Sequence, residues 1–163
     1  MNFKYTVFSV ITLFVIVLDQ STKWYISKTM ELHDSITVIE NFFNITYMRN
    51  TGAAFSFLAD FHYRIPFFIL ASVIAILVIL MVVYRLRPDQ KFAVVSLSLI
   101  FSGALGNLID RVRFGEVVDF LDVHWYQHHW PAFNVADSAI CVGVFLLAID
   151  MYLEENRKKK QGL

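Results

Sequence analysis

Two aspartates in the second half of the chain combine a reactive residue type with surroundings that favour acid–base chemistry. Asp119 lies in the sequence Gly-Glu-Val-Val-Asp-Phe, and Asp137 lies in Phe-Asn-Val-Ala-Asp-Ser. Both stand at the edges of apolar segments in a chain that is 57% hydrophobic. A carboxylate near hydrocarbon costs roughly 2.5–3.5 kcal/mol on insertion scales, so it is usually retained for a task. Two carboxylates held close together share a proton, which makes one an acid and the other a base near neutral pH. The pair therefore indicates hydrolysis inside or beside a membrane.

Polar residues with helical spacing accompany this pair. Residues three or four apart lie on one face of a helix. Taken singly, each group is explained by an internal ion pair or by a carboxylate at a helix N-terminus. Taken together, they place the polar faces of three helices at one depth, which is typical of a functional site in a membrane protein. The groups are Asp19 with Lys23; Asn107 with Asp110 and Arg111, next to Gly106; and Asn134 with Asp137, while Asn50 and Asp119 come from the segments above them.

The sequence contains no pattern that is typical of another kind of catalytic site. The sequence has no Gly-x-Ser-x-Gly motif, and no histidine is placed within a helix to activate a serine. Cys141, one helical turn from Asp137, is interpreted as a small packing group. His124, His128 and His129 match no standard zinc spacing, so neither a metal nor another cofactor is expected. Carboxylates, amides and one arginine remain as the reactive groups.

Four apolar segments must position these groups, and they predict an all-α membrane protein. Ile65–Tyr84 is 20 residues without a charge, and Phe92–Ile109 is 18. Each is long enough, or nearly so, to cross a hydrocarbon core of about 30 Å as a helix. Tyr5–Leu18 and Ala132–Ile149 supply two further segments. We expect one integral membrane domain over residues 1–163, with helices at about 4–26, 65–84, 92–111 and 132–151 and external segments at about 27–64 and 112–131.

Basic residues predict the orientation. Lys4, the stretch from Arg85 to Lys91, and the run from Arg157 to Lys160 fall at the N-terminus, the second connection and the C-terminus. Four crossings put these three places on one side, which the positive-inside rule makes the cytoplasm. The first helix lacks a small-x-small cleavage site and is expected to be retained.

The external segments contain a predicted hairpin. Residues 35–39 and 43–48 are rich in β-branched and aromatic side chains and are separated by Glu40-Asn41. A turn is expected at Asn50-Thr-Gly52. The charged tail at 154–160 is expected to be solvated and frayed, and Gly143 is interpreted as a helix-packing residue.

Five blocks of the sequence resemble those of the bacterial lipoprotein signal peptidase (signal peptidase II) family. They occur in the family's order and spacing and span nearly the whole chain, so together they are highly specific. The blocks are Asp19-Gln-x-x-Lys23, Asn50-Thr-Gly-Ala-Ala54, Gly106-Asn-Leu-Ile-Asp-Arg111, Val117-Val-Asp-Phe120 and Phe133-Asn-x-Ala-Asp-Ser138.

The resemblance implies a four-helix aspartyl endopeptidase of the bacterial cytoplasmic (inner) membrane, with both termini in the cytoplasm. It implies a small external β-rich cradle, a short external helix or loop, and an active site near the external face. The implied partners are membrane lipids and prolipoproteins whose cysteine carries a diacylglyceryl group, with cleavage just before that cysteine; no nucleic acid is implied. The family's catalytic pair corresponds to Asp119 and Asp137. Its other characteristic polar positions correspond to Asp19, Lys23, Asn50, Asn107, Asp110, Arg111 and Asn134, with Gly106 in the same block.

The residues themselves suggest roles that agree with this resemblance. One of Asp119 and Asp137 would activate a water while the other, protonated, would polarise the scissile carbonyl and later serve the leaving amine. Either assignment is open, because a coupled pair titrates as a unit. Asn107 and Asn134 would donate hydrogen bonds to the substrate backbone, and Arg111 would balance the charge of its neighbour at position 110.

Two rival interpretations differ in where they place carboxylates. A proton-coupled transporter would carry them near the membrane midplane, whereas here they gather near one face. A presenilin-type intramembrane protease would carry a Gly-x-Gly-Asp motif, which this sequence lacks.

Overall fold

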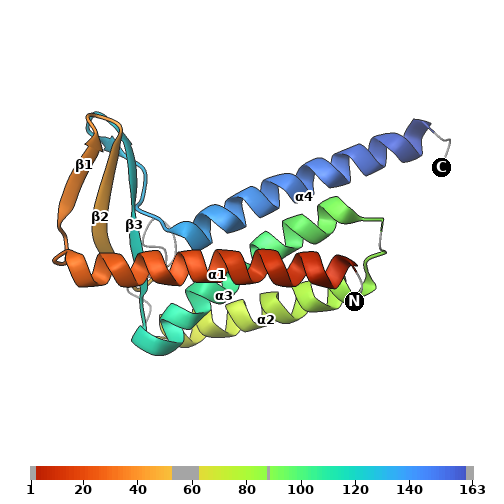
Figure 1. The fold of residues 1–163 in the computed structure, drawn as a ribbon, viewed down its shortest axis with the longest axis horizontal. Coiled ribbons are helices and arrows are strands. Elements are labelled where there is room, and N and C mark those ends of the chain that lie inside the picture. The colour runs from red at the N-terminus through yellow and green to blue at the C-terminus, as the bar shows by residue number, and fades with distance from the viewer. Residues whose placement is uncertain (1–2, 53–62, 88, 161–163) are drawn as a thin grey trace.

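Four long helices and a small antiparallel sheet make up the computed structural model, which describes residues 3–52, 63–87 and 89–160 (Figure 1). All four helices are long and apolar enough to cross a membrane, so the predicted fold class is confirmed. The helices are α1 (Phe3–Thr29), α2 (Arg64–Arg85), α3 (Lys91–Phe114) and α4 (Val135–Lys160), and the strands are β1 (Ser35–Ile39), β2 (Phe43–Asn50), β3 (Val117–Trp125) and β4 (His128–His129).

The helix bounds differ from the expected ones mainly in the second half of the chain. Helix α3 continues three residues beyond the expected end and stops at Gly115, whose left-handed backbone (φ 74°) serves as a C-cap. Helix α4 begins three residues later than expected and runs through the charged tail. The expectation of a frayed tail is therefore wrong. Glu155 and Lys159, one helical turn apart, form an ion pair of 2.6 Å that favours helix in this segment.

Helix α3 is the centre of the bundle. Of its most apolar 18-residue window, 56% is buried inside the protein, against 6% to 17% for the other three helices. Close approach to α4 depends on glycine: a Cβ on Gly103 would lie 2.2 Å from the carbonyl oxygen of Ala136, and one on Gly143 would lie 2.7 Å from that of Ser96. The packing role expected for Gly143 agrees with this geometry.

The end of the bundle that carries both termini is joined by a buried lysine. Lys4 Nζ donates hydrogen bonds to the carbonyl oxygens of Val83, Tyr84 and Leu86, at 3.1, 2.9 and 2.7 Å. Val83 and Tyr84 lie in the last turn of α2 and Leu86 is its C-cap, where the carbonyls of a helix lack a full set of partners within it. A positive charge there also faces the negative end of the helix dipole, so Lys4 ties α1 to α2.

The sheet lies at the opposite end of the helices, in the order β1-β2-β3-β4 (Figure 1). The expected hairpin is confirmed as β1 and β2. Strand β3 was not predicted; it pairs antiparallel with β2 and sets Asp119 opposite Met48. Ile26, Tyr47, Val118 and Phe120 form the apolar core between the sheet and α1.

The expected turn after β2 is also present. The backbone N–H of Gly52 donates a hydrogen bond to Asn50 Oδ1 at 2.9 Å, as in an Asx turn. The rest of that block, Ala53 and Ala54, and the remainder of the first external segment to residue 62 lie outside the described residues. Any part of the external helix or loop implied by the family resemblance that lies within residues 53–62 is also outside the described residues.

Candidate active site

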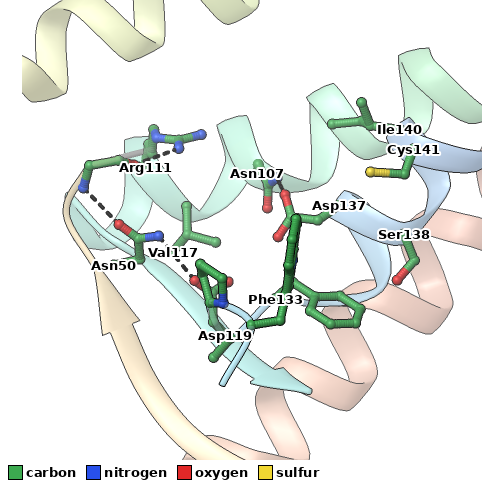
Figure 2. A pocket seen from close by; sticks show the side chains of 14 residues that line it. Asn50, Asn107, Arg111, Val117, Asp119, Phe133, Asp137, Ser138, Ile140 and Cys141 are labelled. Atoms are coloured by element: carbon green, nitrogen blue, oxygen red, sulfur yellow. Dashed lines mark hydrogen bonds between the residues drawn. The ribbon is translucent and has the colours of Figure 1, made fainter. Parts of the chain in front are cut away.

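Asp119 is held on β3 by two amide donors. The side chain is buried, with 3% of the residue exposed. Asn134 Nδ2 donates to one carboxylate oxygen at 2.7 Å. Asn50 Nδ2 donates to the other at 3.1 Å, as Figure 2 shows. The donors come from the start of α4 and the end of β2, so three segments distant in sequence fix the position of this carboxylate.

Asp137 is held by the first turn of its own helix and by α3. Its backbone N–H donates to Asn134 Oδ1 at 2.9 Å, and its carboxylate accepts from the Asn134 backbone N–H at 3.3 Å. This reciprocal arrangement is a capping box, with Asn134 as the N-cap. Asn107 Nδ2 donates to the other carboxylate oxygen at 2.8 Å. Asn134 thus contacts both aspartates. It contacts Asp119 through its side-chain NH₂ and Asp137 through its side-chain oxygen and its backbone N–H.

The environment raises the pKa of Asp119 to about 7. Burial is the largest cause, because it disfavours the charged carboxylate, and the nearby charge of Asp137 acts in the same direction. The hydrogen bonds from Asn50 and Asn134 and the charge of Lys23 lower the pKa by less. A carboxyl with this pKa exchanges its proton readily at neutral pH, which suits acid–base catalysis.

A buried lysine links the polar residues of α1 and α3. Lys23 Nζ lies 2.9 Å from a carboxylate oxygen of Asp19 and 2.9 Å from one of Asp110, and donates to Asn107 Oδ1 at 3.0 Å. Asp19 also accepts a hydrogen bond from the backbone N–H of Ala136 at 2.9 Å. The network therefore runs from α1 to the N-terminus of α4. Through Asn107 it also reaches the carboxylate of Asp137.

Gly106 and Gln20 complete this network. A Cβ on Gly106 would lie 2.7 Å from Asp19 Oδ2 and 3.3 Å from the Ala136 side chain, so only glycine fits beside the carboxylate. Gln20 Nε2 donates to Asp110 Oδ1 at 2.9 Å. The sequence prediction missed Gln20, although its place in the Asp19-Gln-x-x-Lys23 block could have drawn attention to it.

Three of the predicted polar residues have partners that the sequence did not indicate. Arg111 does not pair with Asp110: it donates to the carbonyl of Gly52 at 3.2 Å and lies over the Phe68 ring, 5.1 Å from its centroid. Adjacent helix positions point about 100° apart, so Asp110 turns to α1 instead. Asn107 and Asn134, for which hydrogen bonds to the substrate backbone were expected, donate to Asp137 and Asp119 respectively.

A cavity of about 420 Å³ opens beside the two aspartates (Figure 2). Its wall is mostly apolar. Cys141 lines it and is exposed, so the expectation of a packing thiol is wrong. Several lining residues carried no sequence signal of their own. The cavity is lined by Asn50, Gly52, Asn107, Arg111, Val117, Asp119, Trp130, Pro131, Ala132, Phe133, Asp137, Ser138, Ile140 and Cys141.

The loop histidines lie at the far end of β3. The rings of His124 and His129 stack with centroids 4.5 Å apart, and His129 Nδ1 lies 2.9 Å from Asp122 Oδ1. His128 is exposed on β4. Within residues 3–52, 63–87 and 89–160, no three His, Cys, Asp or Glu side chains are grouped so as to hold a metal ion.

Four helices able to span a membrane, a small antiparallel sheet and two aspartates that line one cavity are the features of a membrane-embedded aspartic peptidase. A family model described as Signal peptidase (SPase) II matches residues 11–153. The chain belongs to the signal peptidase II family, and it is a peptidase that crosses the bacterial membrane several times.

Relatives and solved structures agree with this assignment. The lipoprotein signal peptidase of Geobacter sulfurreducens is 65% identical over 154 residues, which are 94% of this chain and 96% of that protein. The lipoprotein signal peptidase of Geobacter metallireducens is 60% identical over 159 residues, 98% of each chain. A bacterial membrane enzyme solved by the in meso method at 2.3 Å superposes with a TM-score of 0.84 at 38% identity, covering 93% of this chain and 90% of that one. These matches give no support to the transporter alternative.

Proposed function

We propose that this chain, acting as a single domain, hydrolyses the peptide bond just before a diacylglyceryl-modified cysteine in prolipoproteins, with Asp119 and Asp137 as the catalytic residues. The observation that carries the proposal is the position of Asn134. It contacts both aspartates, and both line one cavity. A shared proton needs carboxyls held together in this way.

The chemistry uses one ionised and one protonated carboxyl. The ionised carboxyl takes a proton from a water molecule as the water oxygen attacks the scissile carbonyl carbon. The protonated carboxyl donates its proton to the carbonyl oxygen, and a tetrahedral intermediate forms. When the C–N bond breaks, the leaving amine takes the proton that the base received from water, and the carbonyl re-forms as the oxygen returns its proton to the acid. Asn50, Asn107 and Asn134 keep the carboxyls in position through these proton transfers.

The cavity wall fits an apolar substrate. Its apolar lining residues include Trp130, Pro131, Phe133 and Ile140. A signal-peptide side chain or an acyl chain would lose contact with water there, which is worth roughly 25 cal/mol for each Å² of apolar surface buried. The lipid on the substrate's cysteine thus adds binding energy close to the scissile bond.

The proposed orientation puts both termini in the cytoplasm and the sheet and aspartates near the external face. Lys4 and the basic C-terminal end of α4 support it through the positive-inside rule. An alkaline phosphatase domain fused to the C-terminus is expected to be inactive, because that enzyme needs the oxidising external side. An active fusion would reverse the topology.

The cleavage test uses purified protein in detergent with two fluorogenic prolipoprotein peptides that differ only in the diacylglyceryl group. The unchanged protein should cleave the lipidated peptide and leave the unlipidated one nearly intact. Asp119→Asn and Asp137→Asn should each lose at least about a thousandfold in kcat/KM, and the double variant should be little worse, since members of a catalytic unit are not additive. Substantial activity in either single variant, with folding verified by circular dichroism, would refute the assignment.

A further inference from the structure

A separate cavity with a more polar wall is lined by Lys23 and by neither aspartate of the proposed catalytic pair. It has a volume of about 410 Å³ and opens between the C-terminal ends of α1 and α3, where both helices meet the sheet (Figure 1). The signal peptidase chemistry described above does not use it. It is lined by Gln20, Lys23, Trp24, Ser27, Lys28, Arg49, Asp110, Arg113, Phe114 and Val118.

Two of the four cations on this wall already have anionic partners. Lys23 is paired with two buried aspartates. Arg49 forms an ion pair with Glu116 and receives further support from the hydroxyl of Tyr47, to which its Nε donates at 2.8 Å. Their charges are therefore largely balanced within the protein.

The other two cations lack a counter-ion. Lys28 on α1 and Arg113 on α3 are exposed, and neither is paired with a carboxylate among the residues that the structure describes. A basic residue in the last turn of a helix is stabilised by the helix dipole, which accounts for each one singly. It does not account for their both lining one cavity. Like charges that share a cavity repel each other, and an anion between them would remove that repulsion.

We propose that this cavity binds a phosphate group, and that the group belongs to the head of a membrane phospholipid. A guanidinium presents paired N–H donors that match phosphate oxygens, and an ammonium adds a point charge. Ser27 lines the same wall, and its hydroxyl donates to the carbonyl oxygen of Trp24 at 2.9 Å, so the two cations carry the proposed recognition. Trp24 is 63% exposed and Phe114 is 52% exposed. The Arg113 guanidinium lies over the Phe114 ring, 4.8 Å from its centroid. Tryptophan at a helix end settles at the level of lipid headgroups, so Trp24 would cover the glycerol while the cations hold the phosphate.

A lipid bound at this site would fix how deeply the enzyme sits in the bilayer. Its cations lie on the ends of α1 and α3, and Lys23, which forms its inner wall, donates to Asn107 of the active site. A phosphate held at this level would fix the height of these helix ends relative to the headgroups, and with it the height of the aspartates.

The test measures binding directly and does not depend on peptidase activity. The full chain, purified in a maltoside detergent that contains no phosphate, is titrated into dihexanoyl phosphatidylglycerol below its micelle-forming concentration. The phosphorus NMR line width reports the bound fraction. Lys28→Gln with Arg113→Gln should raise Kd on the order of tenfold or more, since two charge-assisted contacts are lost. Both residues are exposed, so the variant should fold; Lys28→Arg with Arg113→Lys keeps the charges and should keep binding within a few-fold.

The matched control removes the same charge from the other end of the molecule, with Arg85→Gln and Lys91→Gln, and should leave Kd unchanged. An equal loss of affinity in this control would show that the lipid is bound only by the general attraction between opposite charges, and it would overturn the proposed site. Unchanged affinity in the Lys28→Gln, Arg113→Gln variant would overturn it as well.

Competition identifies the source of the phosphate. Dihexanoyl glycerol, which lacks the phosphate, should not displace the lipid; displacement would show that apolar contacts carry the binding and would refute the proposal. Inorganic phosphate should displace the lipid only weakly. Displacement by inorganic phosphate at equal concentration would keep the phosphate site but overturn its assignment to a lipid.

Discussion

The raised pKa of Asp119 predicts a specific dependence of stability on pH. Burial and the neighbouring Asp137 shift the pKa from 3.8 to about 7 in the folded protein. Between these two values the folded state binds more protons than the unfolded state, so the free energy of unfolding decreases as pH rises. The full stability is present below about pH 4 and the loss is complete above about pH 7. A shift of about three units corresponds to roughly 4 kcal/mol.

Asp119→Asn should remove this slope, because an amide does not titrate. The substitution also has a cost: Asn50 and Asn134 both donate to the carboxylate, and an amide offers only one acceptor oxygen. One donor is then left without a partner at about 1–3 kcal/mol. The net expectation is a variant that is less stable than the unchanged protein at pH 5 and equally or more stable at pH 8.

Thermal unfolding in detergent between pH 5 and pH 8 measures both curves. Asp89→Asn serves as the control, since Asp89 is exposed in the connection between α2 and α3, and its profile should follow that of the unchanged protein. A slope that survives in Asp119→Asn would show that another group causes the pH dependence. A flat profile in the unchanged protein would mean that Asp119 does not carry a raised pKa.

Three further predictions concern the surroundings of the dyad. Gly106→Ala should lower both Tm and kcat/KM, because its Cβ would lie 2.7 Å from Asp19 Oδ2; an unchanged Tm would show that the helices separate at little cost. Lys23→Met should destabilise by about 3–5 kcal/mol, because it leaves Asp19 and Asp110 buried without a cation, and Asp110→Asn in the same chain should restore part of the loss; no recovery would argue against the pairing. Cys141→Ala should keep activity, while a bulky thiol reagent on the unchanged protein should block cleavage, because the thiol lines the cavity; inhibition of the Ala variant by the same reagent would locate the effect elsewhere.

The four helices and the polar residues that share one face of each could be predicted from apolar length and spacing. Residues three and four apart must share a helix face, so the grouping of Asp19 with Lys23 follows from the sequence. The partners across helices could not be predicted. Asp110 has a charged neighbour at position 111, yet it pairs with Lys23 because its own helix face points to α1. Spacing defines a face, but the element opposite that face depends on the three-dimensional packing.

Strand β3 could not be predicted because its burial does not alternate. Val117, Val118, Asp119 and Phe120 are all buried in succession, since α1 packs against Val118 and Phe120 on one face of the strand and Asn134, at the start of α4, contacts Asp119 on the other. A half-buried strand alternates apolar and polar residues, whereas one buried on both sides gives only a short apolar run. Asp119 sits inside such a run, so the residue itself stands out in the sequence while the strand that carries it does not.

The two interpretations of Asp137, a helix-capping carboxylate and a catalytic one, turn out to be compatible. It occupies the third position of α4 in a capping box with Asn134, and the same carboxylate faces the cavity. A dipole-stabilised position at a helix N-terminus therefore also fixes the geometry that catalysis needs. This is why asparagine, and not alanine, is the informative substitution there. An amide oxygen can still accept the Asn134 N–H and keep the cap, so a loss of cleavage in Asp137→Asn reports on proton transfer rather than on the start of the helix.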